Sequence, residues 1–322
     1  MICPCEEGSG QLGTTPVNRF KSKALRLGAG VAAFASAALA SGLASAQEDW
    51  QFGFQDAASP VMREIAGFNN ALMVVMAVIS VFVTVLLAWV MIRYRAKANP
   101  VPTKTTHNTG LEVAWTVVPV MILVGIAVPS FSLLFAQYDP GRLIEDYDSS
   151  TALNVKATGL QWSWQYSYLD PEYPIGGSFP FYTSLPVGDV ATLNFDEAEP
   201  RLLEATLPLV VPVDRVVRLQ VTADPTGVLH AFALPAMGVK VDAVPGRITE
   251  SWFLAEREGT YYGQCSELCG RLHYAMPIEL RVVSAEEFEE WAAIAATDDY
   301  VGAKELLDSW ETARLAEQVA GR

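Results

Sequence analysis

The sequence predicts a two-helix transmembrane hairpin, followed by an all-β sandwich and a short helical C-terminal tail. Two long uncharged stretches predict the hairpin. Short runs of β-branched and aromatic residues, separated by turn residues, predict the sandwich. A third observation, one short segment that holds two cysteines, a histidine and a methionine, indicates what the sandwich carries. The 322-residue chain is therefore divided into a membrane part and an extramembrane part.

The N-terminal 46 residues have the pattern of a signal peptide. Four Lys and Arg residues between positions 19 and 26 precede an Ala- and Leu-rich stretch, which ends in Ala44-Ser45-Ala46. A basic region, an apolar core and a small-x-small site are typical of a cleaved secretory signal. We expect cleavage after Ala46, loss of Cys3 and Cys5, and an extracytoplasmic N-terminal segment over 47–64. A third membrane span is the alternative, which the Gly- and Ser-interrupted stretch disfavours.

Residues 65–92 and 113–138 carry no charged side chain. Each stretch exceeds the ~20 apolar residues that cross a bilayer, so we expect two transmembrane helices. The loop between them, 93–112, holds four Lys and Arg residues and one acid, Glu112. Basic loops stay in the cytoplasm, so both flanking parts of the chain should face the outside.

An external domain is predicted over 139–283. Its expected strands are 151–157, 162–168, 210–223, 228–234, 247–255, 259–264 and 276–283. Several short strands of this kind favour a Greek-key β-sandwich. The Pro- and acid-rich stretch 185–209 suggests an inserted surface segment. Ser284 and Glu287 form a capping-box pattern that opens a helix to about 296, and a second helix over 303–319 completes the tail, 284–322.

The external part is strongly acidic. From Asp139 onward the chain has 29 Asp and Glu against 13 Lys and Arg. This balance excludes nucleic acid as a partner and suits a positively charged protein, although many external domains are acidic for solubility alone.

The segment 263–276 predicts a metal site. Cys269, His273 and Met276 are three of the four ligands of a mononuclear electron-transfer copper. The additional thiol of Cys265 lets two sulfurs bridge a pair of metals, which favours a dinuclear copper centre. A disulfide between the two cysteines and a zinc site are the alternatives, but the neighbouring His and Met favour copper.

The missing imidazole is assigned by elimination. Outside this segment the chain has only His107 and His230, and His107 lies between the two spans. His230, in an apolar run that reads as a strand, is the expected partner, although an isolated buried histidine is often only a core residue. A copper loop between the last two strands makes the cupredoxin fold the natural form of the sandwich.

These residues closely resemble subunit II of haem-copper cytochrome c oxidases, from about residue 68 to 283. Three further segments carry the resemblance. They are the first-ligand segment 229–247, the aromatic patch 159–166 and the start of the second span, 106–116. The quinol-oxidase form of the subunit, a membrane-anchored interaction subunit, lacks the copper ligands and is the alternative reading.

The resemblance implies roles for individual residues. Cys265 and Cys269 would bridge two coppers, with His230 and His273 as terminal ligands and Met276 as a weak ligand. For Glu267, the backbone oxygen would bind copper, and the side chain would bind a Mg or Mn ion shared with subunit I. Trp162 would receive electrons from cytochrome c, with Asp170 and Glu172 as docking acids, whereas Trp164 is expected in the core. Glu112 would form the mouth of a proton path.

The same resemblance implies the setting. The chain would be an oxidoreductase subunit in a bacterial plasma membrane, with its C-terminal domain in the periplasm. Its partners would be oxidase subunits I and III, the lipid bilayer, and cytochrome c as electron donor. Haem, O2 reduction and coupled proton translocation would belong to subunit I.

Overall fold

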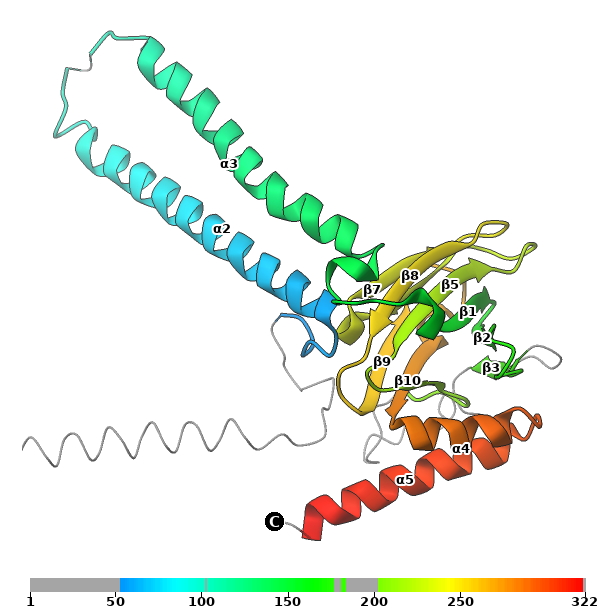
Figure 1. The fold of residues 1–322 in the computed structure, drawn as a ribbon. Helices are drawn as coiled ribbons and strands as arrows, with labels where there is room; N and C mark the ends of the chain where they lie inside the picture. The colour runs from blue at the N-terminus through cyan, green and yellow to red at the C-terminus, as the bar shows by residue number, and fades with distance from the viewer. Residues whose placement is uncertain (1–52, 102, 177–180, 184–201, 321–322) are drawn as a thin grey trace, which may run out of the picture. The chain divides into compact units, whose positions relative to one another are not determined.

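The computed structural model describes residues 53–320, except 102, 177–180 and 184–201 (Figure 1). The predicted signal peptide and most of the predicted surface segment 185–209 lie outside these residues. In the described part, two long helices come first, ten β-strands follow, and two helices end the chain.

The first two helices are long and apolar enough to cross a membrane. Helix α2 spans Pro60–Arg93 and helix α3 spans Thr109–Ala136. Both begin before the uncharged stretches, because Ser59 and Asn108 cap them by accepting from the backbone N–H groups of Met62 and Leu111. Most of their side chains are exposed in the isolated chain, as expected of helices that face lipid or partner helices.

The β-domain consists of two five-stranded sheets. The first has the order β3-β2-β1-β5-β8 and the second the order β4-β10-β9-β6-β7. The strands are β1 (Leu153–Leu160), β2 (Ser163–Tyr168), β3 (Phe181–Thr183), β4 (Leu209–Pro212), β5 (Val216–Ala223), β6 (His230–Leu234), β7 (Val239–Ala243), β8 (Thr249–Leu254), β9 (Gly259–Cys265) and β10 (Pro277–Val283). Strands β1/β5 and β4/β10 pair parallel, and the other pairs are antiparallel.

One apolar core lies between the sheets. Trp164 and Leu219 from the first sheet and Phe232, Tyr261 and Ile278 from the second are all fully buried in it. Alternating burial along β1 and β5 shows that each of these strands turns one face inward, so in the first sheet they contribute every second side chain to the core.

Three details of the strand prediction need correction. The predicted strand 210–223 is two strands, because Asp214 adopts φ +57° and turns the chain between β4 and β5. Strand β7 was not predicted, although Val239–Ala243 alternates in character and pairs with β6. Strand β3 has only three residues, too few to give a periodic signal.

The helical tail covers one side of the sandwich. Helix α4 spans Ala285–Ala295 and begins with the predicted capping box of Ser284 and Glu287, which is confirmed. Phe288 and Trp291 of α4 are buried, and the Trp291 ring lies 5.6 Å from the Tyr168 ring of β2. Helix α5, Tyr300–Ala320, follows and packs against α4 (Figure 1).

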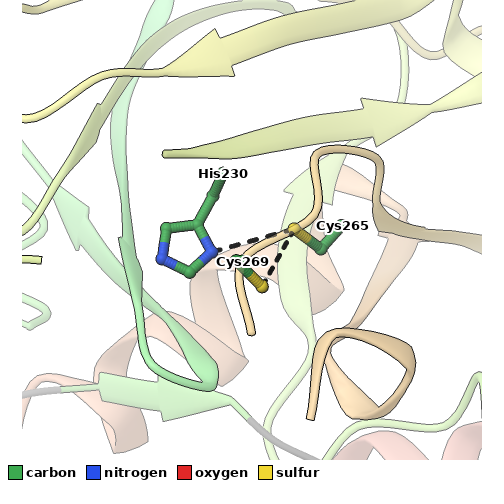
Figure 2. A group of neighbouring side chains, drawn as sticks. All are labelled: His230, Cys265 and Cys269. Carbon is green, nitrogen blue, oxygen red and sulfur yellow. Dashed lines mark hydrogen bonds between the residues drawn. The ribbon is translucent and has the colours of Figure 1, made fainter. Parts of the chain in front are cut away.

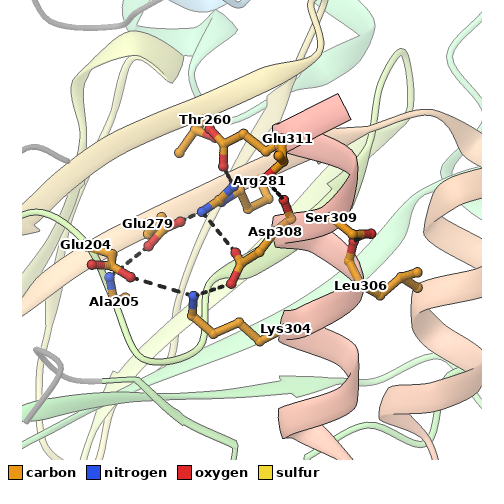
Figure 3. Close-up of polar contacts among 11 residues, drawn as sticks. Glu204, Ala205, Thr260, Glu279, Arg281, Lys304, Leu306, Asp308, Ser309 and Glu311 are labelled. Atoms are coloured by element: carbon orange, nitrogen blue, oxygen red, sulfur yellow. Dashed lines mark hydrogen bonds and ion pairs between the residues drawn. The ribbon is translucent and has the colours of Figure 1, made fainter. Parts of the chain in front are cut away.

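A buried ion network joins α5 to the sheet (Figure 3). Glu279 and Arg281 of β10 are almost fully buried and form an ion pair at 2.5 Å. Arg281 also pairs with Asp308 and Glu311 of α5. The backbone N–H of Ala205 donates to Glu279 at 2.7 Å, so the buried carboxylate has two donors. Helix α5 therefore supplies acidic partners for Arg281 on the outer face of β10.

Candidate metal centre

The first element of the site is His230 at the start of β6. Its side chain is fully buried, and its ring lies edge-to-face against Trp164, with centroids 6.0 Å apart. Gly159 of β1, in the opposite sheet, makes room for it. A Cβ built at Gly159 would lie 2.9 Å from the Cγ and Cδ2 atoms of the His230 ring. The imidazole is therefore held between the two sheets.

The second element is the connection between β9 and β10, residues 266–276. Cys265 ends β9, and its N–H donates to the carbonyl of Met276 at 3.0 Å, which closes the base of this loop. The N–H of Ser266 donates to the carbonyl of Ala231 at 3.0 Å. This second bond ties the loop to β6 beside His230, so the ligands reach one place from two strands.

Four side chains form a row of soft and imidazole donors. The Cys265 Sγ lies 3.7 Å from His230 Nδ1 and 3.9 Å from the Cys269 Sγ (Figure 2). The Cys269 Sγ in turn lies 3.5 Å from His273 Nδ1. Each sulfur therefore has one imidazole on its outer side and the other sulfur on its inner side. The structure thus places Cys265 and Cys269 next to His230 and His273, respectively.

The two cysteines are free and buried thiols. Sulfur atoms 3.9 Å apart are not bonded, since a disulfide needs about 2.05 Å. The predicted alternative of a disulfide is therefore not the form that this structure shows.

Burial sets the protonation of the centre. Burial, and then the neighbouring Cys265, raise the pKa of the Cys269 thiol to about 12. For His230, burial and then the neighbouring His273 lower the pKa of the imidazole. At neutral pH a metal-free site therefore holds a neutral imidazole and a protonated Cys269 thiol. A bound cation would replace that proton, because metals bind the thiolate.

The donor chemistry fits copper. Thiolate sulfur and imidazole nitrogen select copper or zinc over the hard cations, and a thioether favours copper.

The His230 Nδ1 faces Cys265, whereas its Nε2 is buried without a hydrogen-bond partner. A buried polar atom of this kind is unusual, and it leaves the ring oriented by packing rather than by a second hydrogen bond.

The other two predicted ligands lie on the same loop. Met276 is fully buried in the core cluster that also contains both cysteines. The carbonyl oxygen of Glu267 lies 3.4 Å from the Cys265 Sγ and accepts its S–H, so this oxygen points toward the centre. The side chain of Glu267 is exposed to solvent in the isolated chain.

Trp162 lies against the metal loop. It is half-buried in the turn between β1 and β2, and its indole N–H donates to the carbonyl of Cys269 at 3.3 Å. Trp164, which begins the inward-facing set of β2, is fully buried, as predicted for a core residue. Residues two apart on a regular strand share a face. Trp162 is nevertheless less buried than Trp164, because it lies in the turn before β2 and not on the strand.

The contacts of the remaining predicted residues are with residues other than the four donors. Asp170 accepts from the backbone N–H and the side-chain amide of Asn154, both at 2.7 Å. Glu172 is largely exposed and lies 3.8 Å from Arg215. Glu112, in the first turn of α3, accepts from the backbone N–H of Asn108 at 3.3 Å.

Two residues that position the site were not predicted. Gly159 lay within the aromatic patch, and an isolated glycine in a strand does signal a close approach. The side-chain amide of Gln161 donates to the carbonyl of Cys269 at 3.1 Å. An exposed glutamine in a turn gives no signal in the sequence, because its partner is more than 100 residues away.

The described part of the chain is thus a membrane-anchored, cupredoxin-like β-sandwich with a buried site of two thiols and flanking imidazoles. A family model described as "Cytochrome C oxidase subunit II, periplasmic domain" matches residues 153–283, and one described as "Cytochrome C oxidase subunit II, transmembrane domain" matches residues 47–133. The chain belongs to the cytochrome c oxidase subunit II family.

Two individual relatives agree with this assignment, and one solved structure is also similar. A probable cytochrome c oxidase subunit 2 of Rickettsia felis is 43% identical over 245 residues, which cover 76% of this chain and 71% of the relative. Cytochrome c oxidase subunit 2 of Cereibacter sphaeroides is 41% identical over 263 residues, which cover 77% and 81%. The crystal structure of the periplasmic domain of subunit II of cytochrome oxidase of Bradyrhizobium japonicum is 47% identical. It covers 45% of this chain and 94% of that chain, with a TM-score of 0.39.

Proposed function

We propose that this chain accepts electrons from cytochrome c at a dinuclear copper centre and passes them to haem in oxidase subunit I. There, O2 reduction would be coupled to proton translocation. The observation that carries the proposal is the row His230 Nδ1, Cys265 Sγ, Cys269 Sγ and His273 Nδ1, whose neighbours are 3.5–3.9 Å apart. Two adjacent sulfurs, each with its own imidazole, are the donors that a bridged metal pair requires.

In this proposal the thiolates of Cys265 and Cys269 and the imidazoles of His230 and His273 would hold the two coppers. The thioether of Met276 would be a weaker ligand, and the carbonyl oxygen of Glu267 would be a further ligand. When bound, the two coppers supply one-electron redox chemistry. The chain holds the donors in place through strand β6, the end of β9 and the hydrogen-bonded loop base, so little has to move when the centre changes charge.

Electron acceptance is assigned to Trp162. Its indole is partly exposed, and its N–H reaches the carbonyl of Cys269, a proposed ligand residue. Asp170 and Glu172 are the proposed docking acids for a positively charged cytochrome c. Of the two, Glu172 is the better placed, since the Asp170 carboxylate already holds Asn154.

The remaining proposed roles concern a second metal ion, a proton path and the partner subunits. The exposed Glu267 side chain is proposed to bind a Mg or Mn ion shared with subunit I. Glu112 is proposed as the mouth of a proton path, although its contact with Asn108 also gives it a helix-capping role. Subunits I and III would cover the apolar helices α2 and α3, in a bacterial plasma membrane. The alternative, a quinol-oxidase-type interaction subunit, is not favoured, because that form lacks the ligands present here.

The experiment is stopped-flow reduction of the copper-loaded full chain in detergent. Reduced cytochrome c should reduce the parent rapidly and the Trp162→Phe variant far more slowly, with the copper spectrum unchanged. Trp115→Phe is the matched control, since Trp115 is exposed on α3. Reduction by a quinol but not by cytochrome c would contradict the proposal and support the alternative.

A further inference from the structure

The carbonyl oxygen of Cys269 receives two side-chain hydrogen bonds from one turn. The amide Nε2 of Gln161 donates at 3.1 Å, and the indole Nε1 of Trp162 donates at 3.3 Å. The turn connects β1 to β2 in the first sheet, whereas the metal loop connects β9 to β10 in the second. These two bonds therefore cross from one sheet to the loop of the other.

The next residue of the loop, Gly270, lies directly against the indole. Gly270 has φ +124°, a conformation that essentially only glycine adopts. A Cβ at this position would lie 3.1 Å from Trp162 Cζ2 and 3.2 Å from Nε1. The indole therefore packs directly on the backbone of Cys269 and Gly270.

The two hydrogen bonds use the full capacity of one acceptor. A carbonyl oxygen has two lone pairs, and here Gln161 takes one while Trp162 takes the other. With the Gln161 bond in place, the peptide plane after Cys269 is fixed in the direction that the indole N–H needs. Cys269 also carries a thiol of the metal site, so one peptide sets both the indole and the sulfur.

We propose that Gln161 is a positioning residue, which holds the Cys269 peptide so that Trp162 stays in contact with the metal loop. The clamp consists of the Gln161 amide, the Cys269 carbonyl and the Trp162 indole, with Gly270 as its seat. Its consequence for electron transfer rests on the proposed function, whereas its geometry does not.

The first test measures the clamp without any electron transfer. In the metal-free, thiol-reduced full chain in detergent, hydrogen exchange of the Trp162 indole N–H is followed by NMR with 15N-labelled tryptophan. Trp162→Phe assigns the signal. Gln161→Met removes the donor at similar volume, and Gln165→Met on β2 is the matched control. Because Gln161 is exposed, its replacement leaves the core intact.

Loss of one net hydrogen bond should speed this exchange by ~2- to 12-fold in Gln161→Met and leave it at the parent rate in Gln165→Met. Parent-rate exchange in Gln161→Met, or equal acceleration in both variants, would overturn the clamp.

The second test separates positioning from docking. With copper loaded, Gln161→Met should lower the saturating rate of reduction by cytochrome c and leave the half-saturating cytochrome c concentration unchanged, since the surface charge is unaltered. A raised half-saturating concentration with an unchanged saturating rate would make Gln161 a docking contact and overturn the positioning role. If cytochrome c reduces not even the parent, the proposed function fails, while the exchange experiment still decides the clamp.

Discussion

The ring of His230 packs against Gly159 so closely that a Cβ at position 159 would lie 2.9 Å from two ring atoms. Gly159 belongs to the first sheet and His230 to the second, so the position of the imidazole ring depends on the distance between the two sheets. One methyl group on β1 should therefore displace a proposed metal ligand without touching the metal loop.

The Gly159→Ala variant should fold with a loss of ~1–3 kcal/mol, the usual cost of overpacking a core. Its copper spectrum should be altered, and copper should be lost more easily to a chelator. Gly67→Ala is the control, since a Cβ at Gly67 on α2 meets nothing within 4 Å. A parent-like spectrum and copper retention in Gly159→Ala would show that the ring adapts and that the glycine is not needed.

Copper uptake should depend on pH, because burial raises the pKa of the Cys269 thiol to about 12. Binding must displace that proton at any physiological pH. The sign follows directly: lower pH favours the protonated thiol and weakens binding, by at least ~10-fold per pH unit for one displaced proton. Chelator competition with Cu(I) between pH 6 and 8 measures this slope. An affinity that does not change with pH would contradict binding by the Cys269 thiolate.

Neutralising Asp170 should lower the stability of the fold, whereas neutralising Glu172 should affect association with cytochrome c. Asp170→Asn disturbs two hydrogen bonds to Asn154, so unfolding free energy should fall by ~1–3 kcal/mol in a denaturant titration. Glu172 is largely exposed and only loosely paired with Arg215. Glu172→Gln should leave stability within ~1 kcal/mol and instead slow association with cytochrome c at low salt. An unchanged salt dependence in Glu172→Gln would remove this residue from the docking surface.

The attachment of α5 should depend on the pair Glu279 and Arg281 (Figure 3). Arg281→Met leaves the buried carboxylate of Glu279 without its cation, which should cost ~3–5 kcal/mol and free α5 for limited proteolysis. The double variant Glu279→Leu, Arg281→Met should recover most of the stability, because no buried charge remains uncompensated. If the single and double variants are equally destabilised, the cost arises from lost packing rather than from the unpaired charge.

The metal loop could be predicted because its ligands are close in sequence and chemically unusual together. His230 could be predicted as well, since the chain offers so few other histidines. The contacts that hold these ligands could not be predicted, because Gly159 and Gln161 reach the site from the opposite sheet. Likewise, the turn at Asp214 depends on a positive φ that the polar and apolar pattern does not encode.

The helix ends also show which features could be predicted from the sequence and which could not. The uncharged stretches located the spans, but the starts of α2 and α3 are set by the caps Ser59 and Asn108, outside those stretches. The capping box at Ser284 was predicted because both of its partners are local in sequence.

The central claim is that the row of two thiols and two imidazoles holds a pair of coppers. Metal analysis and EPR of the copper-loaded full chain test it most directly. We predict two coppers per chain, with the EPR pattern of one electron shared equally by two copper nuclei. Cys265→Ser, which removes one of the two sulfurs, should leave a mononuclear or empty site. One copper per chain in the parent, with the spectrum of a blue mononuclear centre, would contradict the account.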